Sequence, residues 1–159
     1  MSAVSKSPNG NRMLSGKLPI YQSDRSLREA QSVAAAWSFK DETTDYTNGV
    51  LKAVSGLVEA TAPRLWAYEI RNSVLMGLRR KRITRADADD FLDSIVDLRI
   101  SLVDPLSYDG IFALADRHGL TLYDAAYLDL AMREDLPIAS LDTELIRAAE
   151  RSGVDLFRP

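Results

Sequence analysis

The stretch Thr121–Asp142, TLYDAAYLDLAMREDLPIASLD, constrains the fold more than any other part of this chain. Thr121 and Asp124 have the Thr-x-x-Asp spacing of a helix capping box, and apolar residues then recur at helical spacing until a Leu-Pro pair. The apolar run that follows is typical of a short buried strand, and Asp142 stands at its end before another helix pattern. We therefore expect an α/β fold in which Asp124 and Asp142 lie where helices begin, a position at which α/β proteins build sites.

The rest of the chain continues this alternation of helix patterns and short β-rich segments. Predicted helices cover residues 26–39, 46–60, 64–82, 84–98, 107–118, 121–135 and 143–152, and predicted strands cover 18–22, 100–103, 138–141 and 154–157. Residues 61–63, Thr-Ala-Pro, are expected to be a break. This order predicts a parallel central sheet flanked by helices. Residues 1–17 are expected to be a disordered tail because they are polar and lack periodicity, which leaves 18–159 as a single domain.

Composition limits the classes of function. The 159 residues are 46% hydrophobic and 27% charged, which suits one globular domain with a core. The absence of cysteine excludes disulfides and thiolate metal sites and is compatible with a cytoplasmic location. No apolar run approaches the roughly 20 residues of a membrane span. The net charge of −3 is not typical of a nucleic-acid binder, so such a contact needs a local basic patch. The run Arg79–Arg82 is expected to be a solvated helix end, where cations suit the negative pole of the helix dipole, and its alternative role is a phosphate-contacting edge.

Three acidic residues stand out, and each has an ordinary structural explanation. Asp124 belongs to a capping box, and Asp142 can be the N-cap of the last helix. Glu69 lies at the margin of the apolar stripe of its predicted helix, where a half-buried acid can bond to Asn72 or Ser73. Taken together, however, acids from separate elements are the ligands that Mg²⁺ and Mn²⁺ prefer. Such ions activate water and stabilise the charge that develops on a phosphodiester.

The histidine and the tryptophans have structural explanations as well. A zinc site is not expected, because the chain has one histidine, His118, and no cysteine. His118 precedes Gly119 at a predicted helix C-terminus, where a partly positive imidazole suits the helix dipole. Trp37 and Trp66 are assigned to the core, although they are also candidates for an exposed contact between subunits.

Several fragments of the chain resemble VapC-type PIN-domain toxins. The fragments YDAAYLDLA, PIASLD and ELIRAAERSGV resemble the C-terminal half of that family. The fragments APRLWAYEIRNSVL and RRKRIT are similar to its middle, and SVAAAWSFKDE is similar to its first helix. The likeness covers about residues 32–157, and the order of the fragments makes it more specific than any one of them.

This resemblance implies a function and a set of site residues. Members of the family are Mg²⁺- or Mn²⁺-dependent endoribonucleases, commonly homodimers, and each is the toxin of a pair that a small antitoxin neutralises. By resemblance, Glu69 corresponds to the family's glutamate on the helix after a Pro-x-Leu turn. Asp124 corresponds to the aspartate of its Tyr-Asp-Ala motif, and Asp142 to the aspartate that closes its Leu-Asp strand. These three would be the catalytic residues, holding the metal directly or through water while an RNA substrate is hydrolysed.

The sequence departs from the family at the first aspartate. The family has an Asp two residues before a Ser, whereas here Ser32 is present and Ala30 occupies the Asp position. Either Leu18–Gln22 supplies the first strand and Asp24 the missing carboxylate, or the protein is a degenerate relative. The alternative function is then a non-catalytic PIN-fold module that binds a partner or RNA without cutting it. A third hypothesis is an α/β protein in which the acids are only caps or surface groups.

Overall fold

The computed structural model describes residues 17–19, 33–39, 41–56, 58–98 and 100–159. The elements are β1 (Lys17–Pro19), α1 (Val33–Ser38), α2 (Asp45–Ser55), β2 (Glu59–Pro63), α3 (Trp66–Arg79), α4 (Arg85–Val96), β3 (Ile100–Val103), α5 (Tyr108–His118), α6 (Leu122–Glu134) and α7 (Thr143–Arg151). Most of the expected tail, residues 1–16, lies outside the described residues, and Lys17 begins β1. None of the described helices is long and apolar enough to cross a bilayer.

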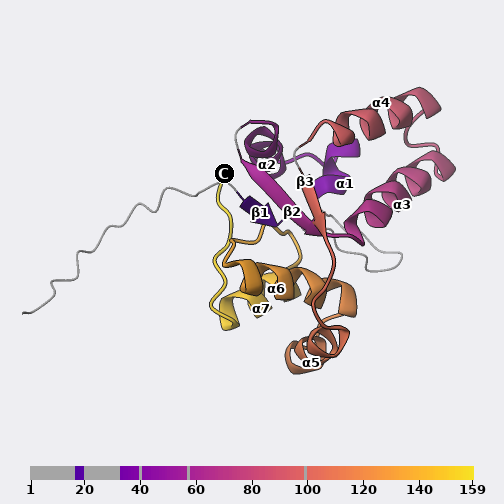
Figure 1. Ribbon diagram of the computed structural model, residues 1–159. Coiled ribbons are helices and arrows are strands. Elements are labelled where there is room, and N and C mark those ends of the chain that lie inside the picture. Colours follow the sequence, from indigo (N-terminus) through magenta and orange to yellow (C-terminus); the bar gives the residue numbers. More distant parts are fainter. Residues whose placement is uncertain (1–16, 20–32, 40, 57, 99) are drawn as a thin grey trace, which may run out of the picture.

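The sheet is parallel, with the strand order β1-β2-β3. The register pairs Lys17 with Glu59 and Ala60 with Ile100. Figure 1 shows α1 to α4 on one side of the sheet and α5 to α7 on the other, where α6 packs against β1 and β2. The predicted architecture, a parallel central sheet flanked by helices, is confirmed.

The core lies between the sheet and these two groups of helices. Ile70 of α3, Leu128 of α6 and Leu145 of α7 are fully buried, and burying a side chain of this size contributes roughly 1.5–3 kcal/mol. Trp66 is 3% exposed, and the half-buried Trp37 donates its indole N–H to the carbonyl of residue 47 at 2.8 Å. Both tryptophans therefore belong to the core, and the idea that they form an exposed contact between subunits is wrong.

Local capping signals were good predictors of where helices begin and end. The capping box of Thr84 and Asp87 opens α4, and Ser107 caps α5 by accepting from a backbone N–H. Gly119 ends α5 with a φ of 67°, a left-handed conformation that glycine adopts without a steric cost. The predicted bounds of α4 and α5 hold within two residues because these signals are local.

The central strand β2 is the main error of the sequence prediction. A helix was expected to run to Ala60, with a break over residues 61–63, but α2 ends at Ser55 and Glu59–Pro63 is a strand. The segment EATAP has low intrinsic strand propensity. It is a strand because it pairs with β1 and β3 and because residues 60–63 are buried by helices on the two faces.

The last two predicted strands are shorter than expected. In the described part of the chain, residues 138–141 and 154–157 are joined by one isolated parallel bridge between Ile138 and Leu156. Pro137 has no N–H to extend the pairing toward the N-terminus. Toward the C-terminus, the N–H of Asp142 donates to the hydroxyl of Ser140 at 2.9 Å instead of to a neighbouring strand. The pairing is therefore limited to this bridge, because the chain turns at Ser140–Asp142 and enters α7.

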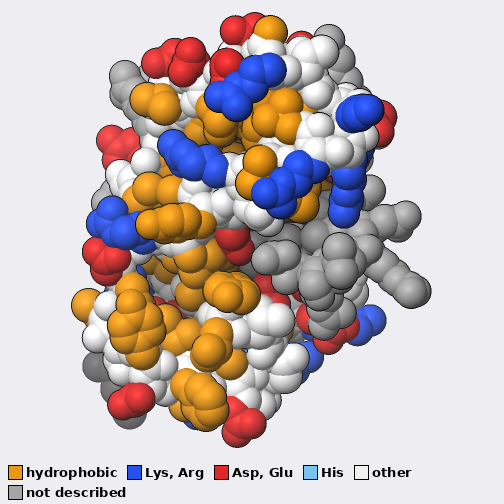
Figure 2. All heavy atoms as spheres, turned by 90° about the vertical axis from the view of Figure 1, so that its right-hand side faces the viewer, with side chains coloured by type: hydrophobic (Ala, Val, Ile, Leu, Met, Phe, Trp, Pro, Cys, Tyr) orange, Lys and Arg blue, Asp and Glu red, His pale blue; other side chains and the backbone are white. Residues whose placement is uncertain are grey.

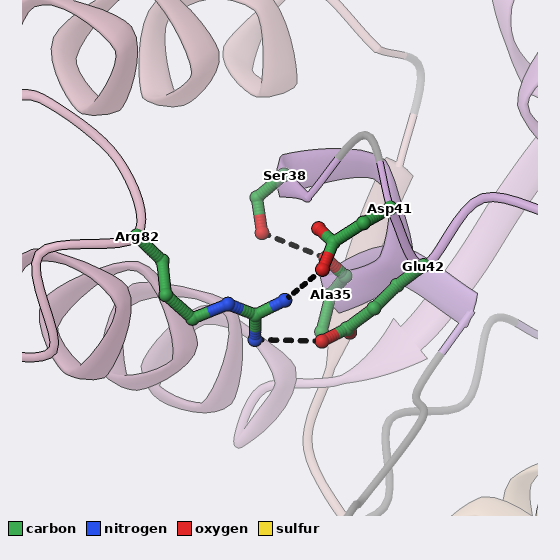
Figure 3. Close-up of polar contacts among 5 residues, drawn as sticks. All are labelled: Ala35, Ser38, Asp41, Glu42 and Arg82. Carbon is green, nitrogen blue, oxygen red and sulfur yellow. Dashed lines mark hydrogen bonds and ion pairs between the residues drawn. The ribbon is translucent and has the colours of Figure 1, made fainter.

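One arginine connects the turn after α3 to the loop between α1 and α2 (Figure 3). The Arg82 guanidinium lies 2.9 Å from Oδ2 of Asp41 and 2.7 Å from Oε1 of Glu42. The guanidinium carbon Cζ of Arg82 also lies 4.2 Å from the centre of the Phe39 ring. These carboxylates hold the pKa of Arg82 above its usual value. The expectation that the whole run Arg79–Arg82 is a solvated helix end is therefore wrong for Arg82.

Replacing Arg82 by Ala is expected to lower the free energy of unfolding by about 1–2 kcal/mol, because two ion pairs and a ring contact are lost together. Urea denaturation measures this effect. Arg85→Ala is the control, since Arg85 pairs only with Asp89 on its own helix among the described residues. Such a helical pair contributes roughly 0.2–0.5 kcal/mol. Equal losses in the two variants would contradict a linking role for Arg82.

Candidate functional site

The candidate site lies where the parallel strands lead into helices. β2 ends at Pro63, and the chain enters α3, whose first turn contains Glu69. The carboxyl ends of the strands in an open parallel sheet are the usual place for a binding crevice. Glu69 is half-buried, as its place on the helical wheel predicts.

Asp124 is placed by the start of α6. Its backbone N–H donates to Oγ1 of Thr121 at 3.1 Å, and that hydroxyl donates to Oδ2 of Asp124 at 2.7 Å. The predicted capping box is therefore present. A cap is normally solvated, however, whereas Asp124 is only 3% exposed. Capping alone does not explain a carboxylate that has been removed from water, because burying such a charge is costly.

Asp142 is placed by the start of α7. Its Oδ1 accepts the N–H of Leu145 at 2.8 Å, so its predicted role as the N-cap is confirmed. The hydroxyl of Ser140 accepts the N–H of Asp142 and fixes the turn before the helix. The side chain of Asp142 is thereby held at the entrance to α7.

The negative charges of the Asp124 and Asp142 carboxylates interact with each other. Burial raises the pKa of Asp124, the negative charge of Asp142 raises it further, and the hydrogen bond from Thr121 lowers it, with a result of about 6. Two like charges in a partly buried place repel each other. A cation beside the pair would relieve this repulsion, and perturbed carboxyl groups of this kind are typical of functional sites.

Glu69 is linked to the same helix by a tyrosine. The hydroxyl of Tyr127, a fully buried residue of α6, donates to Oε2 of Glu69 at 2.5 Å. Tyr127 lies three residues after Asp124, so the two side chains share one face of α6. Tyr127 lies on a different helix from Asn72 and Ser73, the partners that the sequence suggests for Glu69. Sequence reasoning did not single out Tyr127, although a buried tyrosine usually needs a hydrogen-bond partner.

The chemistry of the three acids fits a hard divalent ion, since carboxylate oxygens are its preferred ligands. Within the described ranges, no group of three or more Asp, Glu, His or Cys side chains is close enough to hold a metal ion. The charges of Asp124 and Asp142 interact, while Glu69 accepts a hydrogen bond from Tyr127, which lies three residues after Asp124 on α6. Ala30 and the alternative carboxylate Asp24 both fall within residues 20–32, outside the described residues.

The surroundings of His118 disfavour a positive charge on its ring. Burial lowers the pKa of His118, and the positive charges of Arg151 and Arg117 lower it further. Its Nε2 lies 3.4 Å from Oγ of Ser152. Both effects act against the charged form of the imidazole, which the sequence predicts at this end of a helix.

Three known proteins are similar to this chain in sequence or in fold. Ribonuclease VapC3 from Pyrobaculum aerophilum is 33% identical over 98 residues, which are 59% of this chain and 74% of the relative. The crystal structure of PAE2754 from P. aerophilum has a TM-score of 0.61 at 20% identity and covers 84% of each chain. That of FitAcB from Neisseria gonorrhoeae has a TM-score of 0.55 at 15% identity and covers 90% of this chain and 97% of that one. No protein-family model matches the chain.

The structural likenesses show the fold alone, since both identities are below 25%. They define the chain as an α/β protein of the PIN-like class. The likeness to the curated relative reaches further, because it covers most of that protein at substantial identity. The chain belongs to the VapC family of PIN-domain proteins.

Proposed function

We propose that the chain is a Mg²⁺- or Mn²⁺-dependent endoribonuclease and the toxin of a toxin–antitoxin pair. The observation that carries this proposal is the buried carboxylate Asp124, whose pKa the charge of Asp142 helps to raise to about 6. A relative that is 33% identical is a ribonuclease by name, which indicates the class of substrate. When bound, the ion supplies positive charge that stabilises a phosphodiester under attack by water.

Three carboxylates of this chain would bind the ion. Asp124 and Asp142 supply two carboxylates whose charges interact, and the capping bonds at the starts of α6 and α7 fix their positions. Glu69 supplies a third carboxylate, which Tyr127 orients from α6. Since Asp124 must be ionised to bind a cation, the affinity for the ion falls as the pH falls through about 6.

The test is cleavage of RNA by the full chain with Mg²⁺ or Mn²⁺, compared with cleavage in EDTA. The variant Asp142→Asn is expected to cleave at least about 10²-fold more slowly, the size of effect seen when one electrostatic stabiliser of a reaction is removed. Asn is a good N-cap, so it still accepts the N–H of Leu145 and preserves α7.

Glu144→Gln is the matched control, because it removes one carboxylate from the same helix. Glu144 pairs with Arg147, and its side chain is 41% exposed. This control is expected to cleave RNA at the wild-type rate. Full cleavage in EDTA, or equal rates for Asp142→Asn and wild type, would refute the proposed roles.

A non-catalytic PIN-fold module is the second candidate. Two observations favour it: Ala30 stands at the position of the family's first aspartate, and no group of three metal-binding side chains assembles among the described residues. Calorimetric titration with Mn²⁺ separates the two candidates. Tight Mn²⁺ binding that Asp142→Asn abolishes supports the nuclease. The absence of Mn²⁺ binding in a protein that still binds RNA supports the module.

Two partners belong to the proposed function. A small antitoxin would neutralise the toxin in the cytoplasm, where its RNA substrate is present. A homodimer is the second expectation, and exposed apolar side chains in the loop before α5, on α5 and at the start of α6 support it: Leu106, Tyr108, Phe112, Leu122 and Tyr123. Sedimentation that shows only monomer at high concentration would contradict the dimer.

A further inference from the structure

The outward face of α3 combines positive charge with an exposed aromatic ring. Tyr68, Arg71, Leu75 and Arg79 follow one another at spacings of three or four residues, so they share one side of the helix. The exposed fractions are 78% for Tyr68 and 42% for Leu75, and both arginines are exposed. The opposite side of α3 is buried in the core. Tyr68 therefore presents its ring to solvent on the same side of the helix as the two arginines.

The charge on this face is of one sign. In the described part of the chain, Arg71 and Arg79 form no ion pair, and Arg71 donates only to a backbone carbonyl of its own helix at 2.9 Å. The only acid on α3 is Glu69, which accepts a bond from the buried Tyr127. The outward face of α3 is therefore cationic, although the protein has a net charge of −3.

This face borders the candidate site. Tyr68 directly precedes Glu69, so the exposed ring and the half-buried carboxylate leave neighbouring backbone positions. Figure 2 shows several Lys and Arg side chains, with acidic ones among them, on the upper half of this side of the molecule, the half in which α3 and α4 lie in Figure 1. Acidic side chains are also visible between this upper half and the lower half, on which apolar side chains predominate.

Unpaired guanidinium groups and an exposed ring suit one class of ligand better than others. Arginines contact phosphates without regard to sequence, and an aromatic ring stacks on an unpaired base. A double helix hides its base faces, whereas a single strand presents them. Arg71 and Arg79 lie about 12 Å apart along the helix axis, so they meet different phosphates of one strand.

We infer that the outward face of α3 binds single-stranded RNA, with Arg71 and Arg79 on phosphates and a base stacked on Tyr68. This inference rests on the proposed function, because it extends the path of the same substrate away from the carboxylates. It assigns the recognition of the strand to residues that do not touch the ion.

The experiment measures binding of a fluorescent single-stranded oligoribonucleotide by anisotropy, in EDTA and over a range of salt concentrations. The double variant Arg71→Gln/Arg79→Gln is expected to bind more weakly, and its slope of log affinity against log salt should be smaller by about 1.4, roughly 0.7 for each lost phosphate contact. The control Arg85→Gln/Arg147→Gln removes the same charge from α4 and α7 and should leave the slope nearly unchanged.

The aromatic contact has a separate test. Tyr68→Leu is expected to weaken binding roughly five- to hundredfold without a change in the salt slope, because it removes stacking but no charge. Phe112→Leu is its control, since Phe112 of α5 is 64% exposed. Loss of affinity in the arginine variant alone would show a general polyanion surface and overturn the stacking.

The outcomes distinguish this inference from the proposed function. If the α3 variants bind RNA as wild type does while Asp142→Asn abolishes cleavage, the inference is overturned and the nuclease stands. If Asp142→Asn keeps RNA affinity but loses cleavage, and the α3 variants lose affinity, both are supported. If the wild-type chain binds no RNA in EDTA, the inference is overturned, while cleavage with Mg²⁺ or Mn²⁺ still decides the proposed function.

Discussion

Replacing Asp124 by Asn is expected to reduce RNA cleavage at least about 10²- to 10³-fold and to make the folded protein more stable at neutral pH. Activity is lost because the amide has no negative charge with which to bind a cation. Stability is gained because Asn is similar in shape and accepts the N–H of Thr121, yet it brings no charge into a place that is 3% exposed. The two effects therefore have opposite signs, which a simple folding defect does not produce.

The pH dependence follows from the pKa of Asp124. Folding raises that pKa from 3.8 to about 6, so the charged form destabilises the folded protein relative to the unfolded chain. This destabilisation is fully present above pH 6, and it disappears as the pH falls toward 4 because the folded protein takes up the proton first. Its upper limit is roughly 2–3 kcal/mol. Asp124→Asn should therefore be about 1–2 kcal/mol more stable than wild type at pH 7.5 and equal to it near pH 4.

Urea denaturation in EDTA at several pH values measures this difference. Other groups also titrate over the range, so the quantity of interest is the variant minus wild type at each pH. Asp116→Asn on α5 is the control, because it makes the same substitution at an exposed position on a different helix. An Asp124→Asn variant that is less stable than wild type at pH 7.5 would argue against a destabilising charge at this position.

Features that depend on nearby residues could be predicted from the sequence. The capping box at Thr121 and Asp124, the N-cap at Asp142 and the glycine end of α5 are each set by residues within a few positions. The central strand β2 could not be predicted, because EATAP pairs with segments about 40 residues away on either side. Its strand conformation is imposed by tertiary packing, which overrides local propensity.

The candidate site shows the same division. Asp124 and Asp142 could be named because helix starts are visible in sequence, and Glu69 because its place on the helical wheel is unusual. Their mutual geometry could not be predicted, because it depends on how α3, α6 and α7 meet. The hydrogen bond between Tyr127 and Glu69 joins residues that are 58 positions apart, so no local sequence pattern predicts it.

Replacing Tyr127 by Phe is expected to weaken Mn²⁺ binding roughly 10- to 100-fold, the usual effect of removing a hydrogen bond that orients a metal ligand. The ring still fills its buried space, and only the hydroxyl that donates to Oε2 of Glu69 is lost. The free energy of unfolding of the variant should also be about 1–2 kcal/mol lower than that of the wild type, because a buried carboxylate oxygen loses a hydrogen-bond donor. Calorimetric titration with Mn²⁺ measures the affinity without any need for catalysis.

Two further measurements separate orientation of Glu69 from general damage to the fold. Thr47→Val removes a buried hydroxyl and a capping bond from α2, away from the acids, so it should lower stability while leaving Mn²⁺ affinity unchanged. A double-mutant cycle with Glu69→Gln should show non-additive losses, because Tyr127 acts through the carboxylate that this substitution neutralises. Additive losses would mean that Tyr127 affects the ion by another route. Rescue of cleavage in Tyr127→Phe by excess Mn²⁺ would place its effect on the affinity for the ion, which is the role that the bond to Glu69 predicts.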